Sequence, residues 1–254
     1  MKIFAIKENN VSNEIGYLFY YEKTKEFYIE LLDGLEEWDI PMLLASLYKK
    51  GERTIGDYWS RAWVNQRIVP SDRQNIGQIL RDNNLKRYDE FDLLCLASGR
   101  CEQDDFYITQ IKLDDLQPDI LERRKRRIKN ITIIGSGKAV VFFKDNTVKI
   151  CEVDISEDSD MDLLTGGYGI TLDGKETITS EELYKKGITL QLSGDDLTLL
   201  IKENIVNTQE AMKILNCSRQ YINELVKRGT LTPIKSYNKS ITFLKSDVLC
   251  LNQT

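Results

Sequence analysis

Side chains that could recognise another molecule are concentrated near the end of the chain. Between residues 218 and 228, Arg219, Gln220, Asn223 and Lys227 recur at a spacing that places them within about 100° of one another on an α-helix. Guanidinium and amide groups match the hydrogen-bonding edges of guanine and adenine, and both cations suit phosphate oxygens. The spacing therefore predicts a polar helix face able to contact a nucleic acid.

The residue types present exclude several other chemistries. The 254 residues include no histidine, which excludes Ser-His-Asp and Cys-His catalysis and histidine zinc sites. The five cysteines form no Cys-x-x-Cys pair, which indicates reduced, mostly buried thiols in a cytoplasmic protein. Asp104, Asp105, Asp114 and Asp115 could hold a divalent cation, but their spacing matches no known metal loop. We therefore predict no catalytic residue, no metal and no cofactor; an enzyme acting on nucleic acid through these aspartates is the third hypothesis.

The polar face needs two helices and a hairpin to position it. Thr208 can cap a short helix, which Asn216 can end because asparagine tolerates the left-handed conformation. Ser218 can cap a second helix that ends before Gly229, with an apolar stripe of Ile222, Leu225 and Val226. Residues 234–243 then indicate a hairpin with a polar, basic tip, and Ser246 starts a final short turn.

This segment resembles the excisionase-like, MerR-type winged helix-turn-helix. The resemblance covers about 45 residues, and the matching stretches are Glu210-Ala211, Ser218-Arg219-Gln220-Tyr221-Ile222, Arg228-Gly229-Thr230-Leu231-Thr232-Pro233 and Ser246-Asp247-Val248. Two features depart from the pattern, since Asn216 stands where glycine is usual and the wing lacks an arginine pair.

The resemblance implies binding to duplex DNA, with a recognition helix from Ser218 to Arg228 in the major groove. Arg219, Gln220 and Asn223 would then contact base edges. Backbone contacts would come from Tyr221, Lys227 and Arg228 on the helix. The wing would contact flanking phosphates or the minor groove through Lys235, Tyr237, Asn238 and Lys239.

The distribution of charge agrees with a DNA-binding segment. Residues 204–254 carry seven basic and three acidic side chains, a net charge of +4, whereas residues 1–203 carry −9. If one such module neutralises roughly four phosphates, the logarithm of its affinity should fall with the logarithm of salt concentration with a slope of about −3.6. Because that is weak for one module, we expect a homodimer or additional contacts.

An alternative function uses the same module on a different partner. Helix-turn-helix folds also serve as protein–protein adaptors, so an antitoxin-like or phage-defence adaptor is the alternative to a transcriptional regulator. Binding to duplex fragments at low and high salt would distinguish the two.

The remaining sequence predicts an α+β protein of three domains. Residues 1–118 form an aromatic-rich mixed domain, with strands expected at 17–21 and 26–31 and helices from 41, from 71 and at 88–97. Residues 119–200 form a β-rich domain preceded by a linker helix, and 204–254 form the winged helix-turn-helix. Residues 119–200 loosely resemble a small bacterial β-rich domain of unknown function. The stretches that carry this resemblance are Asp145-Asn146-Thr147-Val148 and Glu182-Leu183-Tyr184-Lys185-Lys186-Gly187. A small-molecule or protein effector could act on the N-terminal domain.

Two further segments have competing interpretations. The basic run 121–129 could touch phosphate, but we favour a solvated helix face that pairs with acidic residues. Residues 59–75 mix tryptophan, arginine and amides, and we favour core tryptophans with a polar rim over a ligand pocket. No segment approaches the roughly 20 apolar residues that a membrane-spanning helix needs, and the N-terminus lacks the features of a signal peptide.

Overall fold

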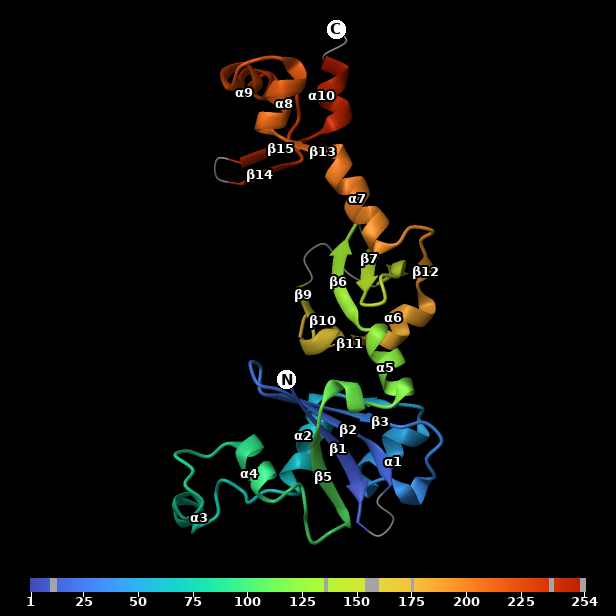
Figure 1. Ribbon diagram of the computed structural model, residues 1–254, viewed down its shortest axis with the longest axis vertical. Helices are drawn as coiled ribbons and strands as arrows, with labels where there is room; N and C mark the ends of the chain where they lie inside the picture. Colours follow the sequence, from blue (N-terminus) through green and yellow to red (C-terminus); the bar gives the residue numbers. More distant parts are fainter. Residues whose placement is uncertain (10–12, 135–136, 154–159, 175, 238–239, 252–254) are drawn as a thin grey trace. The chain divides into compact units, whose positions relative to one another are not determined.

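The computed structural model describes residues 1–9, 13–134, 137–153, 160–174, 176–237 and 240–251. It contains helices and several antiparallel sheets, which confirms the predicted mixed α+β class (Figure 1). The chain divides into two compact units, residues 1–127 with 161–181 and residues 128–160 with 182–254. This division does not follow the three expected ranges, because side chains from 116–121 and 164–168 pack on the N-terminal sheet.

The first unit is built on a five-stranded antiparallel sheet in the order β4-β3-β2-β1-β5. Both of its faces are covered, so successive residues of a strand enter two different cores. In β1, for example, Phe4 and Ile6 enter one core while Ile3 and Ala5 enter the other. This explains why the strands are apolar almost throughout instead of alternating with polar residues. The strands are β1 (Lys2–Glu8), β2 (Glu14–Tyr21), β3 (Glu26–Leu31), β4 (Thr54–Ile55) and β5 (Phe106–Ile111).

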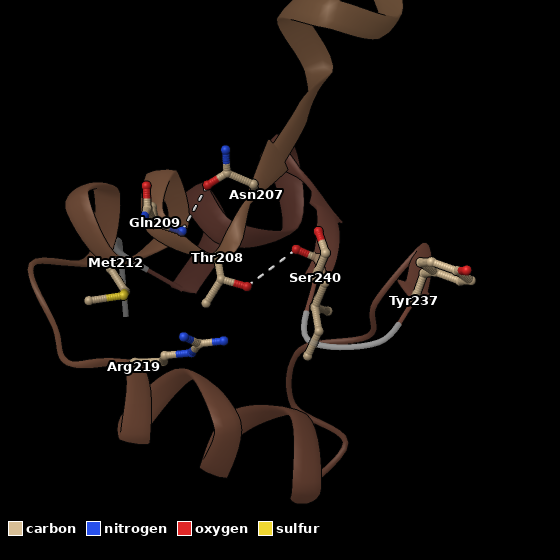
Figure 2. Close-up of a pocket in the computed structure, with 8 residues that line it drawn as sticks. Asn207, Thr208, Gln209, Met212, Arg219, Tyr237 and Ser240 are labelled. Atoms are coloured by element: carbon tan, nitrogen blue, oxygen red, sulfur yellow. Dashed lines mark hydrogen bonds between the residues drawn. The ribbon is translucent and has the colours of Figure 1, made fainter.

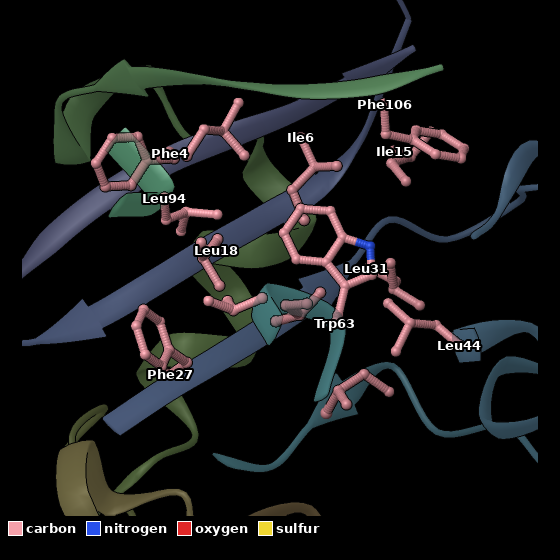
Figure 3. Packing of buried hydrophobic residues seen from close by; sticks show 14 of the residues in the cluster. Phe4, Ile6, Ile15, Leu18, Phe27, Leu31, Leu44, Trp63, Leu94 and Phe106 are labelled. Carbon is pink, nitrogen blue, oxygen red and sulfur yellow. The ribbon is translucent and has the colours of Figure 1, made fainter. Parts of the chain in front are cut away.

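One face of this sheet packs against helices. Figure 3 shows Trp63 from α2 among Ile6, Leu31 and Leu44, and its side chain is fully buried. The helix expected from residue 71 begins only at Ile76. Two tight turns precede it, in which the N–H groups of Arg73 and Ile76 donate to the carbonyls of residues 70 and 73. The helices of this region are α1 (Met42–Lys49), α2 (Asp57–Asn65), α3 (Ile76–Asp82) and α4 (Glu90–Leu96), with a 3₁₀ turn at Glu37–Asp39.

The expectation of core tryptophans in residues 59–75 is confirmed for Trp63, which is fully buried, and wrong for Trp59, of which 41% is exposed. The Arg67 guanidinium stacks on the Trp63 ring at 3.6 Å and donates a 2.5 Å hydrogen bond to Asp104. Burial lowers the pKa of Arg67, and the Asp104 carboxylate opposes that shift. Asp104 is thus bound to an arginine, and among the described residues no three acidic, cysteine or histidine side chains converge as metal ligands would.

The other face of the sheet packs against the linker helix α5 (Pro118–Lys125), whose first residue is Pro118. It also packs against Tyr168, whose ring stacks on Tyr28 at 4.0 Å. Tyr168 directly precedes β10 (Gly169–Leu172), which forms a small three-stranded sheet with β9 (Met161–Leu163) and β11 (Glu176–Thr179). Two 3₁₀ turns lie at Leu113–Asp115 and Thr165–Gly167.

Part of the basic run is buried against this second face. The fully buried Glu30 carboxylate accepts hydrogen bonds from Arg124 at 3.1 Å and from the Tyr168 hydroxyl at 2.8 Å, and Arg127 lies 3.2 Å away. Arg127 also donates to the Ser180 hydroxyl at 3.0 Å. Burial raises the pKa of Tyr168 well above its usual value. Pairing with an acidic residue is thus confirmed, but the expectation of a solvated face is wrong for Arg124 and Arg127.

The second unit begins with a four-stranded antiparallel sheet in the order β12-β8-β7-β6. Helix α6 (Ser180–Lys186) contacts this sheet, and the hydroxyl of Tyr184 donates to Asp145 at 2.8 Å. Gly187 follows at a point where a Cβ atom would lie 2.6 Å from the Cys151 sulfur, so a side chain there would force the strand away. The strands are β6 (Ile128–Ile133), β7 (Lys138–Phe143), β8 (Val148–Glu152) and β12 (Ile188–Thr189).

Helix α7 (Gly194–Asn204) then leads to the last part of the chain. The Ser193 side chain caps it by accepting from the N–H of Asp196 at 3.1 Å. Within the described ranges, no helix combines the length and the apolar character needed to cross a membrane.

Candidate nucleic-acid interface

The polar helix face predicted from the sequence lies in a small domain-like cluster at the end of the second unit. Its core contains Val206, Ala211, Ile222, Leu225, Leu231, Phe243 and Val248. Leu231 lies in the segment between α9 and β14, and the other core residues come from three helices and from a three-stranded antiparallel sheet in the order β13-β15-β14. The elements are β13 (Ile205–Asn207), α8 (Thr208–Leu215), α9 (Arg219–Lys227), β14 (Lys235–Tyr237), β15 (Ser240–Leu244) and α10 (Lys245–Leu251).

The residue that caps helix α8 lies one position before the predicted one. Asn207, not Thr208, is the cap, because its side-chain oxygen accepts from the N–H groups of Gln209 at 2.8 Å and Glu210 at 3.0 Å. Glu210 accepts in return from the N–H of Asn207 at 2.8 Å, which completes a capping box. Thr208 is instead buried, and its hydroxyl donates to the carbonyl of Ile241 at 3.3 Å. This hydrogen bond ties α8 to β15.

The turn between α8 and α9 follows the prediction closely. Asn216 ends α8 in the left-handed conformation, with φ 46° and ψ 47°. Ser218 caps α9 by accepting from the N–H of Tyr221 at 3.3 Å. Gly229, with φ +71°, follows the last turn of α9. Both helix ends adjoining this turn are therefore fixed by local side-chain and backbone chemistry.

Helix α9 has one buried face and one exposed polar face. Ile222 is fully buried and Leu225 nearly so, which fixes the rotation of the helix about its axis. The predicted contact residues all lie on the exposed surface: Ser218, Arg219, Gln220, Tyr221, Asn223, Lys227 and Arg228. Besides the Ser218 cap, Arg228 pairs with Glu224 at 3.2 Å.

The predicted wing is a short exposed hairpin. Strand β14 pairs with β15 in the register Lys235↔Thr242, Ser236↔Ile241 and Tyr237↔Ser240. The Lys235 and Tyr237 side chains are exposed, and 71% of Tyr237 is accessible to solvent. Asn238 and Lys239, the other two predicted wing contacts, lie outside the described residues. The segment expected as a final short turn is the two-turn helix α10.

A groove separates the start of α8 from the wing. Its volume is about 640 Å³, and Figure 2 shows Arg219 extending into it on the side of Thr208. The sequence did not reveal this groove, because it exists only where β15 packs beside α8, more than thirty residues apart. The lining residues are Asn207, Thr208, Gln209, Met212, Arg219, Tyr237, Ser240 and Ile241.

The exposed groups of this region include guanidinium, ammonium, amide and hydroxyl donors, which are the groups that position phosphates and bases in nucleic-acid complexes. Comparisons of the chain with protein-family models, with curated proteins and with solved structures found no match.

Proposed function

We propose that this protein binds double-stranded DNA through residues 204–254 and acts as a transcriptional regulator. In this proposal the segment works as a winged helix-turn-helix, with α9 in the major groove and the β14–β15 hairpin as the wing. The observation that carries it is the exposed polar face of α9, held outward by the burial of Ile222 and Leu225. The net charge of +4 on this segment supports the same partner.

The position of each exposed polar residue on α9 or the wing suggests which part of the DNA it would contact. Gln220 and Asn223 are exposed near the start and middle of the helix, where side chains reach base edges in the major groove. Lys227 at its end, and Lys235 in the wing, would contact the backbone. The mixed N-terminal unit and the β-rich sheet of residues 128–189 would bind an effector or set the oligomeric state.

A cavity in the first unit is where we propose that a small effector binds. Its volume is about 200 Å³, and it combines aromatic walls with charged side chains. The Tyr20 and Phe91 rings stack there at 4.1 Å, and Lys25 pairs with Asp89 at 2.9 Å. Half of its lining residues are aromatic and half are charged, which suits a small effector that has both an apolar part and an ionic group.

We also propose that the protein is a homodimer. One module of net charge +4 neutralises few phosphates, so two copies on one duplex would bind far more tightly. Helix α7, which directly precedes β13, leaves Leu199, Leu200 and Ile201 more than half exposed. A second copy of α7 would cover this apolar surface and place two modules on one duplex.

A protein–protein adaptor is the second candidate, and one observation favours it. Tyr221, Ile234 and Tyr237 are large apolar or aromatic side chains that are about half or more exposed on the same module. Such side chains are typical of protein interfaces. Titration of the full chain with duplex DNA at low and high salt separates the two functions, because binding to phosphates weakens steeply with salt.

A further inference from the structure

The side chains that line the groove beside Arg219 carry charges that are unusual for an acidic protein. Of its eight lining residues one is a cation and none is a carboxylate, although the chain carries 40 acidic residues. Asn207, Gln209, Ser240 and Tyr237 add amide and hydroxyl groups. Nearby Glu210 is held by the backbone of Asn207 in the capping box, at 2.8 Å. The groove therefore favours an anionic occupant.

The size and shape of the groove restrict that occupant further. A volume of about 640 Å³ is much larger than a single phosphate ion needs, and the groove is open to solvent. It lies between the start of α8 and the wing, with the first residue of the recognition helix, Arg219, in its lining, so that a strand seated there would contact both the wing and the recognition helix. We propose that this groove takes the sugar–phosphate backbone of one DNA strand, and that Arg219 contacts a phosphate there. This inference rests on the proposed DNA-binding function.

The position of Arg219 separates it from the other polar residues of α9. Arg219 is the first residue of the helix, and its side chain lies in the groove (Figure 2). Asn223, one turn later, is exposed on the helix but does not line the groove. The sequence assigned both residues to base edges. The groove instead gives Arg219 a backbone role and leaves base recognition to Gln220 and Asn223.

The groove is also held in place before any ligand binds. The Thr208 hydroxyl donates to the Ile241 carbonyl at 3.3 Å, which joins the α8 wall to the wing wall. The Asn207 capping box fixes the first turn of α8 at the same edge. A preformed groove loses little conformational entropy when it binds a backbone.

Single-phosphate neutralisation tests this assignment on the full chain. A preferred duplex is first selected from a random library, and variants of it then carry one uncharged methylphosphonate linkage each. We expect one linkage to weaken wild-type binding about tenfold, and that penalty to disappear in Arg219→Ala. Asn223→Ala is the matched control, and it should retain the penalty at that linkage.

Sequence and salt dependence provide the second measurement. We expect Arg219→Ala to bind all duplexes about tenfold more weakly and to reduce the salt slope by about 0.9, with the base preferences of the wild type unchanged. Arg219→Lys should recover most of the affinity, because a phosphate needs the charge more than the planar fork. Asn223→Ala should instead relax the preference at one base pair and leave the slope unchanged.

Three results would overturn the assignment. Loss of preference at one base pair in Arg219→Ala, with an unchanged salt slope, would make Arg219 a base-reading residue. Unchanged affinity in that variant would show that the groove stays empty in the complex. If wild-type protein selected no duplex at all, the proposed DNA-binding function itself would fail, and this inference with it.

Discussion

At the scale of single residues, the most constrained charge is the Glu30 carboxylate. It is fully buried, and one of its oxygens is shared by Arg124, Arg127 and the Tyr168 hydroxyl. Burial by itself would lower the pKa of Arg124, but Tyr168 and Glu30 raise it, so this arginine stays charged. Removing one partner of such a cluster leaves the others buried without compensation.

We therefore expect Glu30→Ala to lower the free energy of unfolding of the first unit by about 3–5 kcal/mol. Urea unfolding followed by tryptophan fluorescence measures this, since Trp38, Trp59 and Trp63 all lie in that unit. Glu122→Ala is the matched control, because Glu122 pairs with Lys125 at 2.5 Å on the exposed side of α5. It should change stability by less than about 1 kcal/mol. Equal effects of the two substitutions would contradict the account of the buried cluster.

A second single-residue feature is the left-handed backbone at Asn216. Glycine adopts this conformation without steric cost, whereas alanine is strained there by about 1–2 kcal/mol. We expect Asn216→Gly to slow hydrogen exchange in α8 and α9, and Asn216→Ala to accelerate it, as measured by mass spectrometry of the full chain. A change of the same sign in both variants would show that this residue's conformation does not limit the stability of the turn.

At the scale of helices and strands, the sequence predicts helix caps between neighbouring residues but not contacts between segments that are distant along the chain. The caps at Ser218 and Asn216 depend on residues within three positions of one another, so the sequence predicts them correctly. Asn207 was missed because it adjoins Thr208, and either residue type can cap a helix. What decides between them is the Thr208 hydrogen bond to Ile241, which only the folded chain supplies.

The basic run 121–129 shows that the sequence also fails to predict contacts between residues that are far apart along the chain. Its charge density is obvious in the sequence, but Glu30 lies 94 residues before Arg124. No local pattern indicates that this pair will meet on a buried sheet face. The groove beside Arg219 has the same origin, since its two walls come from separate segments. The polar face of α9 could thus be predicted, whereas the surface beside it could not.

The apolar surface of α7 leads to a prediction at the same scale. If two copies pair through this helix, the full chain should have twice its mass of 29.4 kDa by light scattering, and Leu200→Glu with Ile201→Glu should halve it. Arg219→Ala serves as the control, because it should leave the mass unchanged. A wild-type monomer at micromolar concentration would refute pairing through α7.

At the scale of the whole molecule, opposite charges are segregated along one chain. The last 51 residues are basic and the preceding 203 are acidic, with net charges of +4 and −9. An acidic body limits indiscriminate attraction to nucleic acid, so binding depends on the surface formed by α9, the groove and the wing. The central claim is that this surface binds duplex DNA.

The most direct test of that claim is the salt dependence of duplex binding by the full chain, measured by fluorescence anisotropy. We predict that the logarithm of the association constant falls linearly with the logarithm of salt concentration, with a slope of about −3.6 for each bound copy. Lys227→Ala should reduce that slope by about 0.9. Absence of binding even at low salt, or an affinity that does not change with salt, would contradict the account.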